Sequence, residues 1–600
     1  MPVSKNASRP PSEILFGLTL TAALWLTLLC MTITTGMSMS TLHRLEFVTA
    51  DTMLLTAPYW AWPRRMRGIM TITLWTVTAI AIASTLYIRY WGTLLPVTAL
   101  TDPASYNSIV IESTLSSLIP SDILYLLPPT LITLLWLRLR LRRRPIQQPP
   151  LSKRFRSIAA TGCVTAGVIC FMLLSWHDLR YWHSRGSDTI TYGDVMTRRL
   201  SDMGHPRGMG DFRDKGFTLY TLSNAMRLFS NPSVTLTANE RDEIDRFIHE
   251  RRLLRAEYND STCHRGYNLI LIVVESLNAD YIGRMVNGKN ATPTLSGLID
   301  NPGTISALNM VTQVREGGSS DGQMIYNTGL LPIAGDCVAL EFADNTYPSL
   351  AKTLSYPTSI EIIADSRSMW NHSATSRAYG YSTLRDCEDI EAAGYDMAYM
   401  GCDAALFQYA ADMLPDLRQP FLMELTTLSM HYPFEGKCGN GAPRWNENEI
   451  PDPWERRYLN SLTYFDSALA GLFDSLVKAG ISHNTVVVIV SDHDKSIAPS
   501  RNKSNDLTVT HPIAFIAANS GHTLRYLPQI GQADVYPTLL DIMGASPDTW
   551  PGTGRSILGS DPPTSAIDGA GRTHGTPVTA DTHSQWHISD RIIRSNYFKH

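Results

Sequence analysis

The sequence carries little net charge and few cysteines. Its 51 basic and 55 acidic residues leave a formal net charge of −4, which gives no indication that the chain as a whole binds nucleic acid. Only eight of the 600 residues are cysteine. Five of the eight follow the N-terminal third, and because five is an odd number, at least one is predicted to lack a disulfide partner: Cys263, Cys337, Cys387, Cys402 and Cys438.

Acidic residues are also scarce in the N-terminal third. Four apolar runs there have roughly the length that spans a hydrocarbon core about 30 Å thick: Ile14–Met37, Ile69–Tyr87, Ile123–Leu137 and Ile158–Trp176. The first run is too long for a cleavable signal peptide, and further spans follow it. Core helices of a soluble protein are the weaker interpretation. We therefore predict a membrane domain over residues 1–177.

Basic residues determine the predicted orientation. The loop Arg138–Arg156 and the cluster Arg64–Arg67 are basic, whereas the loop Arg89–Asp122 is mainly acidic. By the positive-inside rule, both basic segments and the basic N-terminus belong in the cytoplasm. Four spans cannot satisfy this arrangement, but five can if Phe47–Trp62 is a short span. Asp51 in that span is costly unless it faces other helices or a polar cavity. This predicts a multi-pass protein of the cell (inner) membrane, with about five helices and an extracytoplasmic or periplasmic catalytic domain.

The rest of the chain has the mixed composition of a soluble protein and divides into three predicted segments. Residues 178–266 form an extracytoplasmic linker with helices, one of which starts at the capping box Thr237–Glu240. Residues 267–559 alternate strand-like and helix-like segments, which predicts an α/β domain with a mostly parallel central sheet. Residues 560–600 form a tail that docks on this domain. Within it, Ser584–Phe598 is predicted to be a final strand or hairpin.

Two strongly apolar strands of this domain end in polar residues. One, after Tyr267, stops at Glu275, and another, after Asn484, ends in Ser491-Asp492-His493-Asp494. Ligands collect outside the carboxyl ends of parallel strands. Glu275, Asp492 and His493 are therefore predicted to meet in one metal site. The alternative is that each acid caps a following helix.

Two further polar segments lie between these strands. Arg315–Met324 is a glycine-rich turn that leads into a helix ending near Gly329. A hydroxyl at the mouth of such a turn, where the helix dipole favours an anion, is well placed for a nucleophile activated by a metal. An ordinary capping serine is the alternative. His431 follows the strand Pro420–Leu425 and is a candidate donor to a phosphoryl oxygen, or else a packed turn residue.

Six short motifs occur in a fixed order along the soluble part: Val274–Leu277, Thr292–Leu295, Gly317–Asp321, Thr427–Phe434, Ser491–His493 and Asp534–Asp541. The ordered set resembles the alkaline phosphatase/sulfatase superfamily, and within it the lipoteichoic-acid-synthase-like membrane phosphotransferases. Five N-terminal spans before an extracellular catalytic domain are also that family's layout. The resemblance implies that Glu275, Asp492, His493 and the nucleophile Ser319 are metal ligands. It implies that His431 holds the phosphate of the substrate.

The sequence departs from that family's pattern in several places. The nucleophile is usually threonine, and here two adjacent serines compete; Ser319 is preferred because it precedes a Ser-Asp pair as the family's hydroxyl does. The Trp370-Asn371 pair matches a headgroup-binding motif, but His372 stands where the resemblance implies arginine, and Ile363 where it implies histidine. Trp370 and His372 are nevertheless the predicted substrate-binding residues. Asp494 replaces the usual glycine after the Asp-His pair.

The resemblance implies a metal-dependent phosphotransferase that moves a phospholipid headgroup of the phosphoglycerol type. One divalent ion, Mn²⁺ with Mg²⁺ or Zn²⁺ as alternatives, would hold the Ser319 alkoxide. The donor would be a phosphatidylglycerol-like lipid, the intermediate a phosphoserine-type ester, and the acceptor an extracytoplasmic glycan or lipid. The sequence argues against a sulfatase of the aldehyde-forming type, since no proline or arginine follows Ser319 at the required places.

Two other functions remain open from the sequence. The same scaffold serves a phosphoethanolamine transferase or a sulfatase-like phosphodiesterase. A catalytically silent membrane protein that binds a glycan or a partner is the alternative of another class. The complete set of candidate residues argues against a catalytically silent protein, because a site that no longer carries out a reaction is expected to have lost one of them.

Overall fold

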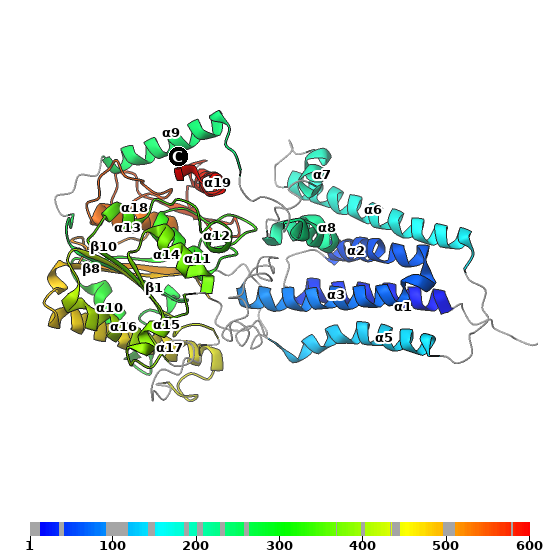
Figure 1. Ribbon diagram of the computed structural model, residues 1–600, viewed down its shortest axis with the longest axis horizontal. Helices are drawn as coiled ribbons and strands as arrows, with labels where there is room; N and C mark the ends of the chain where they lie inside the picture. The colour runs from blue at the N-terminus through cyan, green and yellow to red at the C-terminus, as the bar shows by residue number, and fades with distance from the viewer. Residues whose placement is uncertain are drawn as a thin grey trace, which may run out of the picture. The chain divides into compact units, whose positions relative to one another are not determined.

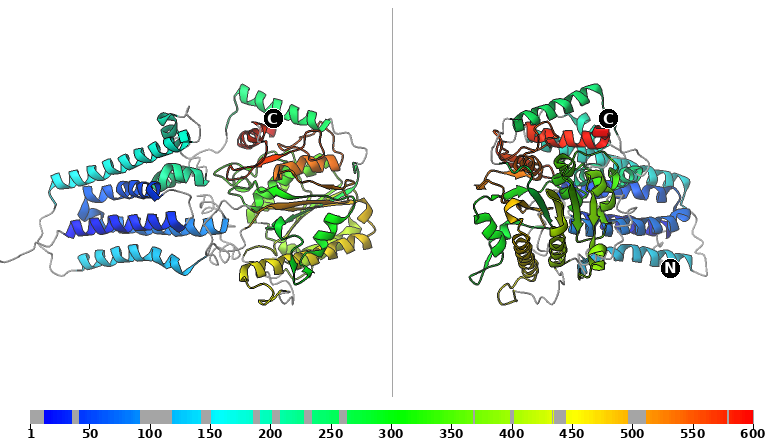
Figure 2. Two further views of the ribbon diagram at one scale, coloured as in Figure 1. Left: turned by 180° about the vertical axis from the view of Figure 1, so that it is seen from behind. Right: turned by 60° about the vertical axis from the view of Figure 1, so that its left-hand side comes forward.

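The computed structural model describes most of the chain, in two compact units. The first unit comprises described residues up to residue 227, and the second begins at residue 234. Figures 1 and 2 show long helices in the first unit and a sheet covered by helices in the second. The described residues are 12–34, 41–91, 118–141, 151–184, 191–200, 208–227, 234–256, 263–367, 369–397, 402–432, 434, 445–495, 511–577 and 580–599.

The first unit is entirely helical in its described part. Four of its segments are long and apolar enough to cross a membrane: Ser12–Thr34, Arg65–Tyr87, Pro120–Arg140 and Lys153–Arg180. They coincide with the four predicted apolar runs. The helices are α1 (Ser12–Thr34), α2 (Thr41–Ala61), α3 (Pro63–Trp91), η3 (Pro120–Leu126), α5 (Leu127–Arg140), α6 (Lys153–Ser184), α7 (Tyr192–Leu200) and α8 (Gly208–Arg227).

The predicted fifth span lies in helix α2, which packs against α1 and α6. Helix α2 is not among the four segments that qualify by length and composition, so its crossing of the membrane stays a prediction. Its Asp51 is buried and accepts hydrogen bonds from the backbone N–H groups of Phe217 and Thr218, at 2.8 and 2.9 Å. Helix α8 is kinked at Gly216, where φ is 81°. Asp51 therefore faces another helix and caps the second part of α8.

The segment 178–266 contributes to both units. Helices α7 and α8 belong to the first unit, and α9 (Ala238–Ala256) belongs to the second. The predicted capping box is present. The Thr237 N–H donates to Glu240 Oε2 at 2.8 Å, and the Glu240 N–H donates to Thr237 Oγ1 at 3.3 Å. Ile244 and Phe247 of α9 are buried in the core of the α/β unit.

A mostly parallel sheet organises the second unit, as predicted. The strand order is β10-β4-β9-β8-β1-β7-β5-β6, and β11 also pairs with β4. Only β9 runs antiparallel to its neighbours, β4 and β8. The strands are β1 (Asn268–Val274), β4 (Ile305–Val311), β5 (Thr358–Ile363), β6 (Thr383–Arg385), β7 (Phe421–Thr426), β8 (Thr485–Ser491), β9 (Ile513–Ala518), β10 (Leu524–Arg525) and β11 (Ile530–Gly531).

Helices cover both faces of this sheet (Figures 1 and 2). Every residue of the central strands β1 and β8 is consequently buried, which explains their uninterrupted apolar sequences. One face carries α9, α11 (Ser319–Thr328), α12 (Val338–Glu341), α13 (Leu350–Leu354), α14 (His372–Tyr379), α18 (Val535–Ile542) and α19 (Ala580–Ser595). The other face carries α10 (Pro293–Asp300), α15 (Cys387–Ala392), α16 (Asp403–Met413) and α17 (Pro453–Lys478).

The C-terminal segment differs from its predicted conformation. Residues 584–598 were expected to form a strand or hairpin, but most of them lie in helix α19. The prediction was wrong because Ile588, Ile592 and Ile593 follow the helical repeat and bury one face of the helix. A short antiparallel pair, β12 (Ser565–Ile567) and β13 (Thr573–Gly575), precedes the helix. The tail docks on the domain through the Leu331 N–H, which donates to Ser589 Oγ at 2.9 Å.

The described cysteines form no disulfide with one another. Cys30, Cys163, Cys170, Cys263, Cys337, Cys387 and Cys402 are all free thiols. Cys438 lies outside the described residues. Stability of the described fold therefore comes from packing and hydrogen bonding.

Candidate active site

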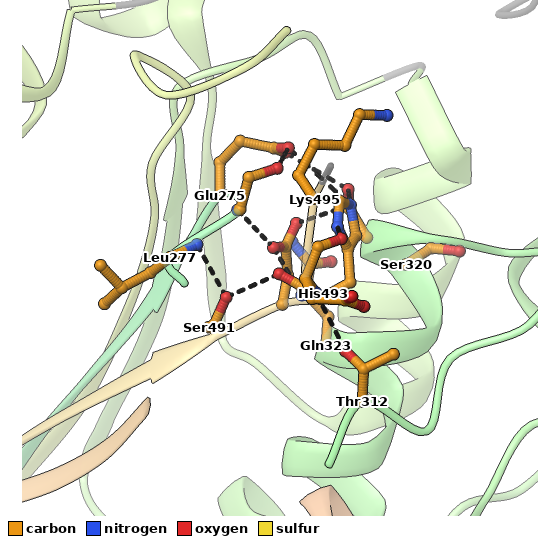
Figure 3. A network of polar contacts seen from close by, with 12 residues as sticks. Glu275, Leu277, Thr312, Ser320, Gln323, Ser491, His493 and Lys495 are labelled. Atoms are coloured by element: carbon orange, nitrogen blue, oxygen red, sulfur yellow. Dashed lines mark hydrogen bonds and ion pairs between the residues drawn. The ribbon is translucent and has the colours of Figure 1, made fainter. Parts of the chain in front are cut away.

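The carboxyl ends of β1 and β8 bring the predicted acids together. The two strands are parallel neighbours, and Val274 pairs with Ser491 in their register. The next residue after each strand is an acid, Glu275 and Asp492, so both side chains emerge at the same edge of the sheet. Figure 3 shows Glu275 and His493 at this edge. The Asp492 N–H donates to the Val274 carbonyl oxygen at 3.0 Å, which extends the ladder to this point.

Three side chains at this edge form a set of potential metal ligands. One ligand atom from each of Glu275, Asp492 and His493 lies within 4.8 Å of the other two. His493 Nε2 is 3.5 Å from Asp492 Oδ2 and 3.8 Å from Glu275 Oε1. Burial, and then the nearby Glu275 carboxylate, raise the pKa of Asp492 to about 7. Two buried carboxylates and an imidazole at this spacing suit a divalent ion, which would relieve their mutual repulsion.

Hydrogen bonds turn each ligand toward the centre of the set. Asp492 Oδ1 accepts from the backbone N–H groups of Ser276 and His493, at 2.8 and 2.7 Å, so Oδ2 points to the site. His493 Nδ1 lies 3.0 Å from the Asp494 carbonyl oxygen. A proton on Nδ1 donated to that carbonyl leaves Nε2 free to bind a metal. Such partners fix the orientation that a metal site requires.

Ser319 lies at the N-terminus of helix α11 and faces these ligands. Its Oγ is 3.4 Å from Glu275 Oε2 and 3.3 Å from His493 Nε2. The close approach depends on Gly322, because a Cβ atom there would lie 2.4 Å from the Asp492 carbonyl oxygen. The helix dipole adds a partial positive charge at this end. The hydroxyl is therefore placed to act as an alkoxide beside a metal.

Ser320 points in a different direction. Its hydroxyl donates to the Gly317 carbonyl oxygen at 2.8 Å and lies 3.7 Å from Cys337 Sγ. The side chain is buried behind the turn. Of the two serines, Ser319 is therefore the one whose hydroxyl faces the ligand set.

The turn that carries Ser319 is held by the C-terminal tail. The Arg315 guanidinium lies 4.0 Å from the centre of the Trp586 ring, and its Nε donates to the Gly569 carbonyl oxygen at 3.2 Å. Asp321 Oδ2 closes the turn by accepting from the backbone N–H groups of Arg315 and Gly317, at 2.8 and 3.0 Å. Residues of the C-terminal tail thus support the position of Ser319.

His431 is half-buried and lies close enough to the ligand set to interact electrostatically with Glu275. It follows β7, whose neighbour in the sheet is β1. Burial lowers the pKa of its imidazole, and the charge of Glu275 acts on it in the opposite sense. A neutral imidazole at this place is suited to donate one hydrogen bond to a phosphoryl oxygen.

The predicted headgroup residues follow β5 in a strained turn. Trp370 and Asn371 have φ values of 48° and 56°. His372 is buried, and its Nδ1 lies 3.5 Å from Glu361 Oε1, so it faces the interior. Asp365, just before this turn, interacts electrostatically with both His372 and Glu275. The turn therefore lies near the same edge of the sheet as the metal ligands.

The sequence interpretation missed Lys495. Its side chain is drawn beside Glu275 and His493 in Figure 3. No sequence motif indicated it, since the only signal was a lysine two positions after His493.

Comparison with protein families and curated proteins identifies relatives of the α/β unit. Residues 267–545 match the family model described as Sulfatase. The chain is 26% identical over 365 residues to the lipoteichoic acid synthase of Staphylococcus saprophyticus, covering 57% of this chain and 55% of that protein. It is 26% identical over 315 residues to lipoteichoic acid synthase 2 of Bacillus subtilis, covering 49% of this chain and 47% of that protein. The chain spans about half the length of the curated relatives it matches.

A solved structure resembles most of the chain. It is the integral membrane protein lipooligosaccharide phosphoethanolamine transferase A from Neisseria meningitidis, with a TM-score of 0.53 and 12% sequence identity. The match covers 89% of this chain and 96% of that chain. At this identity the likeness concerns the fold, a helical membrane part followed by an α/β domain.

Proposed function

We propose that this protein is a membrane-anchored, metal-dependent phosphotransferase, and the match of residues 267–545 to the Sulfatase family model supports the proposal. The observation that carries the proposal is the position of Ser319. Its hydroxyl lies at a helix N-terminus, 3.4 Å from Glu275 and 3.3 Å from His493. An ordinary capping serine has no need of three potential metal ligands beside it, two of them buried and the third half-buried.

The proposed reaction transfers a phospholipid headgroup. When bound by Glu275, Asp492 and His493, a divalent ion such as Mn²⁺ would lower the pKa of the Ser319 hydroxyl. Ser319 Oγ then attacks the phosphorus of the donor in line as its hydroxyl gives up its proton, the bond to the diacylglycerol oxygen breaks, and that oxygen takes up a proton, so that one proton moves in net terms from serine to diacylglycerol. Ser319 holds the headgroup as a phosphodiester until an acceptor hydroxyl displaces it and returns the serine. His431 donates a hydrogen bond to a phosphoryl oxygen throughout.

A phosphoglycerol headgroup is favoured by the names of the relatives, which are lipoteichoic acid synthases. The donor is then a phosphatidylglycerol-like lipid, and the acceptor an extracytoplasmic glycan or glycolipid. Four helices suited to a membrane keep the domain next to a lipid donor and raise the effective concentration of that donor. In this proposal the catalytic domain, residues 267–559, lies on the extracytoplasmic side, which the basic loops favour, and residues 560–600 dock on it.

The proposed headgroup contacts come from the turn after β5. Trp370 supplies an aromatic surface to the headgroup. His372 is buried against Glu361 and fixes the turn that presents the tryptophan. Trp370→Ala is then expected to weaken binding of the donor, and His372→Ala to loosen the turn.

Intact-protein mass spectrometry tests the proposal. The purified, manganese-loaded protein is incubated with phosphatidylglycerol and, separately, with phosphatidylethanolamine. A covalent adduct on the wild-type protein, absent from Ser319→Ala, supports the phosphotransferase, and its mass names the headgroup. If neither lipid gives an adduct and neither is turned over, the proposed activity is wrong. Release of soluble headgroup phosphate with no acceptor product would assign a hydrolase instead.

A further inference from the structure

Lys495 lies half-buried at the edge of the candidate active site. Its backbone is fixed by Asn278, whose side-chain Nδ2 donates to the Lys495 carbonyl oxygen at 2.8 Å. The Lys495 N–H in turn donates to Asn278 Oδ1 at 3.0 Å. Asn278 follows the end of β1 by only a few residues, so this pair of hydrogen bonds ties the segment after His493 to the strand that carries Glu275.

The amine of Lys495 lies on the side of the site where His431 is found. Its Nζ is 5.7 Å from the centre of the ring of Tyr432, the residue next to His431. The charge of Lys495 also acts on His431, His493 and Glu275. A cation and the imidazole proposed to hold a phosphoryl oxygen therefore share one region beside Ser319.

The balance of charges in the candidate site favours an anion beside Lys495. Glu275 and Asp492 together neutralise a divalent ion, so neither needs Lys495 once the ion is bound. Asp494 is an additional negative charge next to His493, and its Oδ2 accepts from the His511 N–H at 3.0 Å. Asp494 alone would repel an anionic phosphodiester, and a lysine at the following position offsets that repulsion. A lysine ammonium is a compact charge with three donors and readily binds phosphate.

We propose that Lys495 is a further substrate-binding residue, whose ammonium binds the phosphate group of the donor together with His431. This inference deepens the proposed function and rests on it for the identity of the donor. The chemistry recognised is a phosphate monoanion or phosphodiester beside a divalent ion. The competing interpretation is that Lys495 is only a counter-ion that holds the carboxylates in place.

Binding of inorganic phosphate to the full-length, manganese-loaded protein in detergent separates these interpretations. We expect Lys495→Met to raise the Kd for phosphate about 10- to 100-fold, the effect of losing one charge-assisted hydrogen bond. Metal content and apparent melting temperature should stay at the wild-type values. Lys495→Arg should restore part of the phosphate affinity. Lys478→Met, at the exposed end of α17, is the matched control and should bind phosphate as the wild type does.

Several results would overturn the inference. Equal phosphate affinity in Lys495→Met and wild type would do so, as would the absence of phosphate binding by the wild type. Loss of metal from both Lys495→Met and Lys495→Arg would assign the residue a structural role instead. The phosphate measurement needs no lipid turnover. If phosphate binding depends on Lys495 but no lipid forms an adduct on Ser319, the inference stands and the proposed donor is wrong.

Discussion

Glu361 on β5 lies directly opposite Glu424 on β7, and both carboxyl groups are buried within the α/β unit. Glu424 Oε2 accepts hydrogen bonds from the Tyr381 hydroxyl at 2.6 Å and from Asn327 Nδ2 at 2.7 Å. Burial, and then the charge of Glu361, raise the pKa of Glu424 from its ordinary value of 4.5 to about 8. Glu424 therefore carries a proton at neutral pH, and its partner Glu361 lies with its Oε1 3.5 Å from His372 Nδ1.

The first prediction concerns the pH dependence of stability. Between pH 4.5 and about 8, the folded protein keeps a proton on Glu424 that the unfolded chain loses, so this group lowers stability as pH rises through that window. The slope for one proton is at most about 1.4 kcal/mol per pH unit. The substitution Glu424→Gln should remove this pH dependence of the free energy of unfolding. Apparent melting temperatures of both proteins in detergent should be similar near pH 5 and diverge in favour of the variant up to about pH 8. A constant difference across this range, as expected of the exposed control Glu388→Gln, would contradict the prediction.

The second prediction compares the adjacent serines. Ser319→Ala should abolish the covalent adduct and turnover, because it removes the hydroxyl that faces Glu275 and His493. Ser320→Ala should keep the adduct, because it loses only a hydrogen bond to Gly317 inside the turn. Intact-protein mass spectrometry reads both outcomes. An adduct that survives in Ser319→Ala and disappears in Ser320→Ala would move the nucleophile by one residue.

The third prediction concerns the metal. Glu275→Ala takes away one charged ligand and should reduce the bound divalent ion from stoichiometric to trace amounts. Elemental analysis of the purified protein measures this directly. Glu455→Ala, which breaks a partly exposed ion pair with Arg284, should retain the metal and serves as the control. A fully metallated Glu275→Ala protein would show that the assignment of this ligand is wrong.

The fourth prediction separates the phosphate-binding imidazole from the metal ligands. His431→Ala should keep its metal and still form the adduct on Ser319, but about 10²–10³ times more slowly, as for a lost oxyanion donor. Rates of adduct formation and metal content are measured on the same preparation. Loss of metal together with activity would instead make His431 a ligand or a structural residue.

The fifth prediction concerns orientation in the membrane. In a background with serine at every cysteine position, Leu527→Cys should react with a membrane-impermeant maleimide in intact cells or spheroplasts. Leu141→Cys, in the basic loop, should react only after permeabilisation. Both side chains are well exposed, at 82% and 72%. Labelling of Leu141→Cys in intact cells would contradict the five-span arrangement and with it the role of α2 as a span.

The strands of the site were predictable because both are buried on two faces. Their uninterrupted apolar sequences mark them clearly, and the polar residues that end them, Glu275 and Asp492, had to meet if the strands were neighbours and parallel. Helix α11 was predictable for a similar reason, since glycines precede it and Gly329 ends it in a left-handed conformation. These features depend on local sequence and one assumption about strand direction.

Contacts between distant segments were not predictable. The hydrogen bonds that Glu424 accepts from Tyr381 and Asn327 join segments far apart in the chain, and no local sequence pattern predicts them. Helix α19 was mistaken for a strand because its isoleucines also suit a short β-segment, and only packing against the core favours the helical repeat. Lys495 was not predicted as a site residue because its position, too, depends on a contact between distant segments. Its position depends on Asn278, more than 200 residues earlier in the chain.

The contacts of the C-terminal tail have a consequence for biosynthesis. The turn before Ser319 rests on Gly569 and Trp586, and the strand leading to it is tied by Gln313 Nε2, which donates to the Ile567 carbonyl oxygen at 3.0 Å. These partners follow Ser319 by about 250 residues in the chain. A nascent chain can therefore make its sheet and the strands that carry Glu275 and Asp492 before the partners that hold the Ser319 turn, and a premature stop codon before residue 567 would leave that turn without this support.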